Sequence, residues 1–367
     1  MLEKYGAYRV KVCVLGAGAW GTALAIHLAK KTSVTLWARD SSHVSGMKKS
    51  KSNPKYLGDF KFPDLLSLND NFKDAVLNCD FILSAIPTSG FRKVLKDLKS
   101  IGSETSLLWA NKGLEASSAN LPFEVINDEF SSSNNDLRSF GVLSGPSFAA
   151  ELIRGLPTAV TIATNDEVFS KKIAPLFHHN NMRSYISSDI AGVCVGGALK
   201  NVIAIAAGIS DGMGFGNNAR AALITRGLSE IKRFGLKVGS KPETFSGLSG
   251  MGDLVLTCTG EYSRNREVGL RLAKGESLQS ILDGLGHVAE GVYTAKEVSN
   301  RASLLNIDMP ITNEVNNVLF HEKSAKDAVL DLIQRPITEE SQSLTAIFKI
   351  QLAPCLIHNN PHTIRSI

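Results

Sequence analysis

Residues 9–21 read Arg-Val-Lys-Val-Cys-Val-Leu-Gly-Ala-Gly-Ala-Trp-Gly, and this stretch decides the fold of the chain. Residues 9–16 are dominated by β-branched side chains and end in a glycine, which is typical of a buried strand. Residues 20–31 are rich in alanine and leucine and suit a helix, and residues 34–38 form a second strand-like run. A strand, a glycine-rich turn, a helix and a strand make a βαβ unit, so we expect a parallel sheet.

The glycine-rich turn has the spacing Gly16-x-Gly18-x-x-Gly21 between a strand and a helix. In this context Gly16 permits the tight turn, Gly18 lets the backbone approach a pyrophosphate, and Gly21 lets helix and strand pack closely. The first turn of the helix offers free N–H groups and a positive dipole end to phosphate. The turn therefore predicts a bound dinucleotide, NAD or NADP, and a purely structural glycine turn is the less favoured interpretation.

The choice between the two dinucleotides depends on the end of the second strand, where the sequence is Ala38-Arg39-Asp40. An acidic residue there favours NAD through the ribose hydroxyls, whereas an arginine accommodates the 2′-phosphate of NADP. Because the chain carries both residues, the sequence leaves the cofactor open, with a slight preference for accepting NADP.

Strands and helices continue to alternate as far as residue 188. Further strands are expected at 80–87, 106–110, 140–144 and 159–163, and helices at 91–98 and 121–130. Beyond 188 helices are expected at 190–209, 219–234, 242–248, 264–274, 277–282, 292–304, 310–320 and 324–333. This order predicts an α/β Rossmann-type domain with a doubly wound, mainly parallel sheet over residues 1–188. An all-α domain for substrate and catalysis follows over 189–340, and the tail 341–367 stays unassigned.

Composition argues against several classes of protein. The formal net charge of +5 is spread over 367 residues without the dense basic stripe of a nucleic-acid binder, and it favours an anionic small molecule. The five cysteines form no C-x-x-C pair and the histidines show no metal-ligand spacing, so we expect reduced thiols and no metal. The N-terminus lacks an apolar run, and the longest apolar stretch, 202–209, is too short to span a bilayer. We therefore expect a soluble, cytoplasmic protein.

Two short motifs follow predicted strands and should therefore lie at the ligand-binding edge of the sheet. They are Asn111-Lys112-Gly113 and Gly145-Pro146-Ser147-Phe148-Ala149. A further lysine, Lys200, is surrounded in sequence by apolar residues of a predicted helix. Burial would lower the pKa of this lysine toward neutrality and suit proton transfer, but a lysine that snorkels to the helix surface is an equal alternative.

Polar residues beside glycines recur in the helical half. Gly250-Met251-Gly252-Asp253 predicts a tight bend that aims the carboxylate of Asp253 at a neighbour. Ser263-Arg264-Asn265 contains a guanidinium, that of Arg264, which can bind phosphate through two hydrogen bonds. Glu290 lies in a glycine-flanked loop, where a carboxylate is expected to be solvated.

These blocks together resemble one family, the NAD(P)-dependent glycerol-3-phosphate dehydrogenases of bacterial type. The blocks are Gly-Ala-Gly-Ala-Trp-Gly-Thr-Ala, Leu-Trp-Ala-Arg, Ala-Asn-Lys-Gly, Leu-Ser-Gly-Pro-Ser-Phe-Ala-Ala-Glu, Gly-Ala-Leu-Lys-Asn-Val, Gly-Asp-Leu with Thr-Cys, Ser-Arg-Asn-Arg and Val-Ala-Glu-Gly. They occur in the family's order over residues 9–340. Blocks in register over this length are far more specific than any single motif.

The resemblance implies a role for each matching position. The implied cofactor-binding residues are Gly16, Gly18, Ala19, Trp20, Gly21, Arg39, Asp40, Lys112, Ala149, Arg264, Val288 and Glu290. The implied substrate-binding residues are Lys112, Gly145, Ser147, Asp253, Ser263, Arg264 and Asn265. Lys200 is the implied catalytic acid and base, while Asp253 either orients Lys200 or binds a substrate hydroxyl. The chain departs from the family at Ala19, where a serine is frequent, and in the tail beyond Ser341.

The activity that the resemblance implies is hydride transfer between dihydroxyacetone phosphate and sn-glycerol 3-phosphate, which supplies glycerol 3-phosphate for phospholipid synthesis. It also implies a homodimer. One alternative is another dehydrogenase of this architecture that acts on a different hydroxy acid or on a sugar acid, and the Lys200-Asn201 and Ser263-Arg264-Asn265 blocks argue against it. A second alternative is a non-catalytic dinucleotide sensor, which would not need Lys112, Lys200 and Asp253 together.

Overall fold

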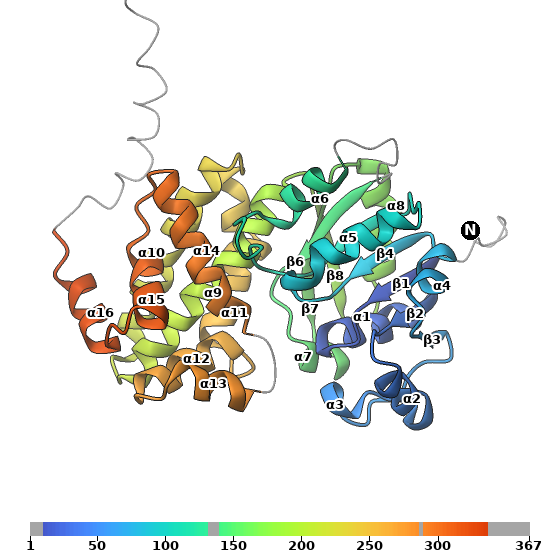
Figure 1. Ribbon diagram of the computed structural model, residues 1–367, viewed down its shortest axis with the longest axis horizontal. Coiled ribbons are helices and arrows are strands. Elements are labelled where there is room, and N and C mark those ends of the chain that lie inside the picture. Colours follow the sequence, from blue (N-terminus) through green and yellow to red (C-terminus); the bar gives the residue numbers. More distant parts are fainter. Residues whose placement is uncertain (1–9, 131–138, 286–288, 337–367) are drawn as a thin grey trace, which may run out of the picture.

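The computed structural model describes residues 10–130, 139–285 and 289–336. A twisted sheet flanked by helices occupies one side of the molecule, and a bundle of helices occupies the other (Figure 1). The two parts meet along helix α9 (Ile190–Gly212), which begins shortly after the last strand. The predicted fold class, a doubly wound α/β domain followed by a helical domain, is confirmed.

Within the described residues the sheet has eight strands in the order β3-β2-β1-β4-β5-β6-β7-β8. They are β1 (Lys11–Leu15), β2 (Ser33–Trp37), β3 (Leu66–Asn69), β4 (Phe81–Ser84), β5 (Ser106–Trp109), β6 (Phe140–Ser144), β7 (Thr158–Thr164) and β8 (Met182–Ser187). Neighbouring strands are parallel except for β6 and β7, which are antiparallel. The chain order reverses between β1 and β4, so their carboxyl ends form the switch point where such sheets bind ligands.

Strand β1 is buried on both faces, which explains its nearly continuous apolar sequence. In the register of the sheet, Val14 lies opposite Leu83 of β4. The side chains of Cys13 and Leu15 join a hydrophobic core that continues into α9, whereas those of Val12 and Val14 join the core on the other face. One core therefore unites the sheet with the helical bundle.

Helices cover both faces of the sheet. They are α1 (Ala19–Ala29), α2 (Ser41–Ser50), α3 (Pro54–Leu57), α4 (Phe72–Leu77), the 3₁₀ helix η1 (Thr88–Gly90), α5 (Phe91–Ser100), α6 (Pro122–Phe130), α7 (Ala149–Ile153) and α8 (Glu167–Phe177). Side chains cap several of them: Asp40 caps α2 and Asp166 caps α8, which satisfies N–H groups that a helix end leaves free. The N-cap of helix α1 is Gly18, and α1 has no side-chain cap, as is also the case for α3, α5 and α7.

Helix α9 is the centre of the helical part. Around it lie α10 (Gly216–Lys237), η2 (Pro242–Ser246), η3 (Leu248–Gly252), α11 (Asp253–Thr259), α12 (Arg264–Ala273), α13 (Leu278–Leu285), α14 (Glu290–Leu304), α15 (Pro310–Phe320) and α16 (Ala325–Ile333). A Cβ atom at Gly208 would lie only 2.0 Å from the carbonyl oxygen of Arg266. Helices α9 and α12 therefore cross with their backbones in contact, which only glycine permits.

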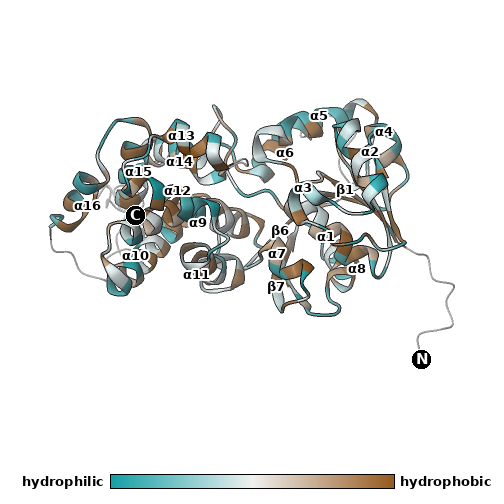
Figure 2. Ribbon diagram, turned by 90° about the horizontal axis from the view of Figure 1, so that it is seen from below, coloured by the Kyte–Doolittle hydropathy of each residue, from teal (hydrophilic) through white to brown (hydrophobic). Residues whose placement is uncertain are grey.

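By length and composition alone, α9 could cross a membrane, since its most apolar window has a mean hydropathy of 1.8. Of that window, 89% is buried inside the fold. The helix lies among α10, α11 and α12 in the view of Figure 2, and it packs against all three. Burial in the protein core therefore accounts for its apolar sequence.

The structure corrects several details of the predicted elements. The sequence does not predict β3 and β8, because β3 has only four residues and β8 is an edge strand with mostly exposed or half-buried side chains. The bend expected at 250–253 is wrong, since η3 is a π-helical turn that leads straight into α11. The helix expected at 242–248 is the short 3₁₀ helix η2. The predicted tail 341–367 lies outside the described residues.

A pair of stacked imidazoles joins α1 to the end of α8. The rings of His27 and His179 lie 4.0 Å apart with 12° between their planes. His27 is buried, and its Nε2 donates to the carbonyl oxygen of Phe177 at 2.9 Å. Burial is the main cause that lowers the pKa of His27 to about 4; the hydrogen bond to Phe177 opposes it, and the nearby His179, Lys30 and Lys31 contribute smaller lowering effects. The fold thus holds this imidazole in its neutral form.

This pair predicts a loss of stability in mild acid. Because the pKa of His27 is lower in the fold, about 4, than its ordinary value of 6.5, stability is fully present above pH 6.5 and is lost as pH falls toward 4. Urea unfolding at pH 7.5 and pH 5 should show a loss of about 2 kcal/mol from this group. The variant His27→Gln keeps a donor for Phe177 but cannot titrate. Between pH 7.5 and pH 5 its free energy of unfolding should therefore fall by about 2 kcal/mol less than that of the unmodified protein. An identical loss in both proteins would contradict the prediction.

Candidate active site

The predicted site residues gather at the carboxyl ends of the central strands. Gly16 follows β1, Lys112 follows β5 and Gly145 follows β6. Ala85, which follows β4, lies against the glycine turn, because a Cβ atom at Gly16 would be 2.9 Å from its carbonyl oxygen. These positions coincide with the topological switch point of the sheet.

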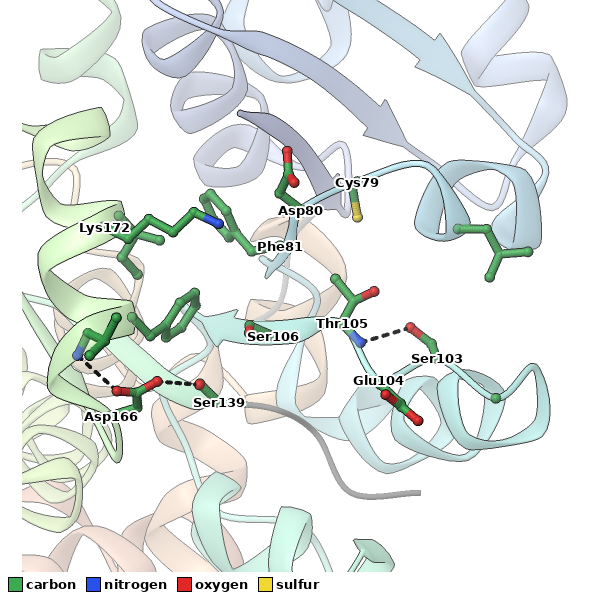
Figure 3. A pocket seen from close by; sticks show the side chains of 15 residues that line it. Cys79, Asp80, Phe81, Ser103, Glu104, Thr105, Ser106, Ser139, Asp166 and Lys172 are labelled. Atoms are coloured by element: carbon green, nitrogen blue, oxygen red, sulfur yellow. Dashed lines mark hydrogen bonds between the residues drawn. The ribbon is translucent and has the colours of Figure 1, made fainter. Parts of the chain in front are cut away.

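A cavity of about 650 Å³ lies at the opposite edge of the sheet (Figure 3). It is lined by Phe81 and Ser106, the first residues of β4 and β5, and by Ser139, which precedes β6. Ser139 donates to the carboxylate of Asp166 at 2.7 Å. Because Rossmann-type sheets bind dinucleotides beyond their carboxyl ends, this cavity is not the cofactor site.

The glycine turn has the geometry that a pyrophosphate requires. Gly16 has a φ of 109°, which L side chains rarely adopt. A Cβ atom at Gly21 would lie 2.0 Å from the carbonyl oxygen of Gly16, whereas one at Gly18 would meet nothing within 4 Å. Ala19 and Trp20, both half-buried, begin the uncapped helix α1. An uncapped helix end beside a bare, open glycine fits a dinucleotide.

The segment after β2 presents one arginine and one engaged carboxylate. Arg39 is exposed. Asp40 accepts from the backbone N–H groups of Ser42 at 2.9 Å and His43 at 3.2 Å, so its carboxylate caps α2. Hydrogen bonding from Ser42 lowers the pKa of Asp40 and keeps it ionised. Arg39 and Asp40 are the two residues between which the sequence left the choice of NAD or NADP open. Asp40 is engaged as the cap of α2, whereas Arg39 is exposed to solvent.

A carboxylate between two lysines occupies the middle of the site. Asp253, the first residue of α11, is 1% exposed. Its Oδ1 accepts from Nζ of Lys200 on α9, and its Oδ2 accepts from Nζ of Lys112 at 2.7 Å. Lys200 also donates to Oγ1 of Thr257 at 2.8 Å, and Lys112 to the carbonyl oxygen of Gly145 at 3.3 Å. Lysines from the sheet and from the helical part therefore share one buried carboxylate.

Burial and charge act against each other in this cluster. The pKa of Lys200 is lowered to about 8, mainly by burial; Asp253 opposes this shift and the positive charge of Lys112 contributes to it. Burial alone would raise the pKa of Asp253, but attraction to Lys112 and Lys200 brings it below its usual value. Lys200 is 7% exposed, so it does not snorkel to the surface. It has a pKa close to the range where a group can both give and take a proton.

The loop after β6 lies beside the lysines. Gly145 has a φ of 134°, and a Cβ atom there would lie 2.9 Å from the carbonyl oxygen of Ala159. Ser147 donates from Oγ to the carbonyl oxygen of Gly145 at 3.0 Å. Ala149 begins α7 and is half-buried. Gly145, Ser147 and Lys112 are thus held together around one carbonyl oxygen.

The three predicted substrate residues at the start of α12 have different surroundings. Ser263 caps the helix by accepting from the backbone N–H of Arg266 at 3.3 Å. Arg264 is exposed and interacts electrostatically with Glu290 and Tyr56. Asn265 is buried and donates a hydrogen bond to Asn201. Of these three predicted substrate residues, only Arg264 has a side chain exposed to solvent.

An amide chain ties these residues to the sheet. Asn265 donates to Oδ1 of Asn201 at 2.9 Å and accepts from the backbone N–H of Gly291 at 3.0 Å. Asn201, next to Lys200, donates to the carbonyl oxygen of Lys112 at 3.3 Å. The chain fixes α14 and α12 relative to the lysine at the end of β5.

Glu290 is not in a solvated loop, so that expectation is wrong. It is the first residue of α14, it is half-buried, and its Oε1 accepts from the backbone N–H of Thr88 at 3.1 Å. Burial raises its pKa. The carboxylate therefore joins the helical part to η1, the short helix after β4. Val288, also implied as a cofactor residue, lies outside the described residues.

Three residues of this site were not predicted. Thr257 lies one helical turn after Asp253, and this i,i+4 spacing would have identified it had α11 been predicted. Asn201 stands in a quoted block without a role of its own. Asn53, which contacts the glycine turn from 36 residues away, has no sequence signal. Among the described residues, no group of histidines, cysteines and carboxylates could hold a metal ion.

The fold and the site together define a class of protein, the dinucleotide-dependent dehydrogenases with a Rossmann-type domain and a helical second domain. Two family models match the chain: the NAD-dependent glycerol-3-phosphate dehydrogenase N-terminus over residues 11–170 and the C-terminus of the same family over residues 189–330. The chain belongs to the NAD-dependent glycerol-3-phosphate dehydrogenase family.

Individual relatives agree with this assignment. The glycerol-3-phosphate dehydrogenase [NAD(P)+] of Methylobacillus flagellatus is 55% identical over 332 residues, which cover 90% of this chain and 100% of the relative. That of Nitrosospira multiformis is 48% identical and covers 89% of this chain and 98% of its own. The crystal structure of glycerol-3-phosphate dehydrogenase from Coxiella burnetii superposes with a TM-score of 0.85 at 39% identity, covering 90% of this chain and 100% of that one.

The shared carboxylate predicts a coupled loss of stability. Asp253→Asn should lower the free energy of unfolding by about 3 kcal/mol, because it leaves buried ammonium groups without their counter-charge. Adding Lys200→Met should cost much less than the sum of the two single changes, with a coupling of at least about 1 kcal/mol in urea unfolding. The exposed pair Lys93 and Asp97, 3.1 Å apart, is the control, and its coupling should stay below about 0.5 kcal/mol. Additive losses at Asp253 and Lys200 would show that the contact carries no energy.

Proposed function

We propose that this protein interconverts dihydroxyacetone phosphate and sn-glycerol 3-phosphate with NAD or NADP as the hydride carrier. The observation that carries the proposal is the buried Lys200–Asp253 pair beside the carboxyl edge of a dinucleotide-binding sheet. The names of the relatives supply the substrate.

The dinucleotide would be held mainly by backbone groups. The residues proposed to contact it are Gly16, Gly18, Ala19, Trp20, Gly21, Arg39, Lys112, Ala149, Arg264 and Glu290. When bound, the nicotinamide supplies the hydride that is exchanged with C2 of the substrate. The exposed guanidinium of Arg39, with Asp40 engaged as a helix cap, favours acceptance of the 2′-phosphate of NADP.

Lys200 would move the proton. During reduction, its ammonium gives a proton from Nζ to the C2 oxygen as the hydride reaches C2, and during oxidation the neutral amine takes that proton back. Its positive charge also stabilises negative charge that develops on the oxygen. A pKa of about 8 leaves both forms accessible near neutral pH. Asp253 acts as a positioning residue that holds Nζ in place and opposes a further fall of the pKa.

The phosphate of the substrate would be bound by positive charge and polar groups around the lysines. Arg264 offers the exposed guanidinium, and Lys112 offers an ammonium beside Gly145. Ser147 is bonded to the same carbonyl oxygen of Gly145 as Lys112, and the buried Ser263 and Asn265 flank Arg264 in sequence and hold the start of α12. A planar guanidinium binds a phosphate through two parallel hydrogen bonds, which fixes the orientation of the substrate.

Replacing the proton donor should slow turnover strongly and leave cofactor binding intact. Lys200→Met should lower kcat for dihydroxyacetone phosphate reduction by about 10²- to 10⁴-fold, because no other group replaces the acid. In the unmodified enzyme, reduction needs the protonated lysine and should decline above about pH 8, while oxidation should rise through the same range. Fluorescence titration with NADPH is the control, and the Kd of NADPH should change by less than about twofold. Lys200 is linked to the proposed cofactor residues only indirectly, because Lys200 and Lys112 both bond Asp253. Near-normal turnover in this variant would refute the assignment.

Removing the exposed guanidinium should weaken substrate binding. Arg264→Ala should raise the KM for dihydroxyacetone phosphate about tenfold or more, because a charge-assisted pair with the phosphate is lost. The matched control is Arg266→Ala, two residues on, whose guanidinium is bonded to Asp211 at 2.9 Å and 2.7 Å. That variant should lose stability and keep its KM. Equal KM values for both variants would rule out a phosphate role for Arg264.

A spectrophotometric assay tests the function itself. Oxidation of NADH or NADPH that depends on dihydroxyacetone phosphate is the expected result, and the ratio of the two rates gives the cofactor preference. Activity only with a hydroxy acid or a sugar acid, or with the corresponding keto acid, would support a different dehydrogenase. Binding of the dinucleotide without any turnover would support a sensor.

A further inference from the structure

Asn53 is a buried polar side chain that contacts the glycine turn. It is 0% exposed and stands at the N-cap of α3. Its Nδ2 donates to the carbonyl oxygen of Ala17 at 3.0 Å and to Oγ1 of Thr22 at 2.8 Å. Its Oδ1 lies 3.0 Å from Nε2 of His43 on α2. One amide therefore joins three segments: the turn, the first helix and α2.

The partners of Asn53 fix the direction of each hydrogen bond. The carbonyl oxygen of Ala17 can only accept, so the atom that faces it must be the amide nitrogen. The oxygen of the amide then faces His43, whose Nε2 must carry the hydrogen. His43 is held in turn through its backbone N–H, which donates to Asp40 at 3.2 Å. The hydrogen bonds therefore run from Ala17 through Asn53 to His43 on α2.

This contact sets the orientation of the peptide that precedes α1. In a trans peptide the C=O and N–H groups point in opposite directions, and the described part of the chain contains no cis peptide. Because the C=O of Ala17 points at Asn53, the N–H of Gly18 points away from it. Gly18 is the N-cap of α1, and no atom lies within 4 Å of its potential Cβ position. The N–H of Gly18 is thus directed by a side chain from outside the turn.

We propose that Asn53 is a positioning residue that orients the Ala17–Gly18 peptide so that its N–H binds the pyrophosphate of a dinucleotide. The proposal deepens the proposed function, since it rests on a dinucleotide being the ligand of this turn. Asn53 itself contacts no phosphate and acts only through the backbone.

The segment that carries Asn53 is also held against α2 through Tyr56 of α3. The ring of Tyr56 lies at 60° to that of His43, with centroids 5.7 Å apart. Asn53 and Tyr56 therefore both contact His43.

The test uses two nucleotide probes that differ in the pyrophosphate. ADP-ribose contains a pyrophosphate and no nicotinamide, and adenosine 2′-monophosphate contains neither. In Asn53→Leu, which is similar in size but cannot donate, the Kd of ADP-ribose from isothermal titration calorimetry should rise about tenfold. The Kd of adenosine 2′-monophosphate should change by less than about twofold, because the hydrogen bonds of the Asn53 side chain go to Ala17, Thr22 and His43 and not to Arg39. Equal weakening of both probes would show a merely structural role and overturn the proposal.

A second pair of variants covers the case in which Asn53→Leu does not fold. Thr22→Val removes one of the two acceptors of the Asn53 amide, and Thr22→Ser keeps it. The Kd of ADP-ribose should be about threefold higher in Thr22→Val than in Thr22→Ser, since a single neutral hydrogen bond is lost. Equal affinities would overturn the proposal.

The outcomes also separate this inference from the proposed function. An unmodified protein that binds ADP-ribose, shows the predicted loss in Asn53→Leu and fails to reduce dihydroxyacetone phosphate would contradict the proposed function alone. An unmodified protein that reduces dihydroxyacetone phosphate while Asn53→Leu binds ADP-ribose normally would contradict the positioning role alone. No binding of ADP-ribose to the unmodified protein would overturn the positioning role, and the reduction assay would then decide the proposed function by itself.

Discussion

The carboxylate of Asp253 between Lys112 and Lys200 is the interaction on which the rest of the site depends. Three charges out of water are costly unless they are paired with good geometry, so each element that carries one must approach closely. Small residues make the approach possible. A Cβ atom at Gly196 of α9 would lie 2.4 Å from the carbonyl oxygen of Ser249 in η3, and one at Gly197 would lie 3.0 Å from Oγ of Ser144. The glycines of α9 therefore let it touch both the π-helical turn and the sheet.

The same constraint organises the boundary between the two parts of the molecule. Polar links from the helices reach the sheet at separate points, and each satisfies a group that burial would otherwise leave unpaired. Asn201 bonds the carbonyl oxygen of Lys112, and Glu290 bonds the N–H of Thr88. Farther from the site, Arg301 of α14 forms an ion pair with Glu124 of α6 at 2.6 Å. These bonds are directional, so they set the orientation of α9 and α14 where the hydrophobic core alone would not.

The parts of the structure that were predictable from sequence are those with a local or periodic cause. Strand β6 was predicted to its exact bounds because burial on both faces leaves an apolar run with clear ends. Strand β8 was missed because its exposed edge residues break that pattern. The sequence identifies Lys200 as a candidate catalytic residue but does not predict its burial, because a lysine in an apolar helix can be buried or can reach the surface. Its pairing with Asp253 spans 53 residues, and no local pattern encodes such a contact.

The glycine turn shows how a missing side chain shifts the work to the backbone. With Ala19 where the family often has serine, the first turn of α1 offers a phosphate no hydroxyl there, so in the proposed function its backbone N–H groups would carry the binding. Backbone N–H groups bind well only when the peptide planes are fixed before the ligand arrives, because ordering them on binding would cost affinity. Gly16 and Gly18 allow the backbone conformation of the turn, but glycines also make the backbone flexible. The rigidity must then come from outside the motif, and the bonds from Asn53 to Ala17 and Thr22 provide it.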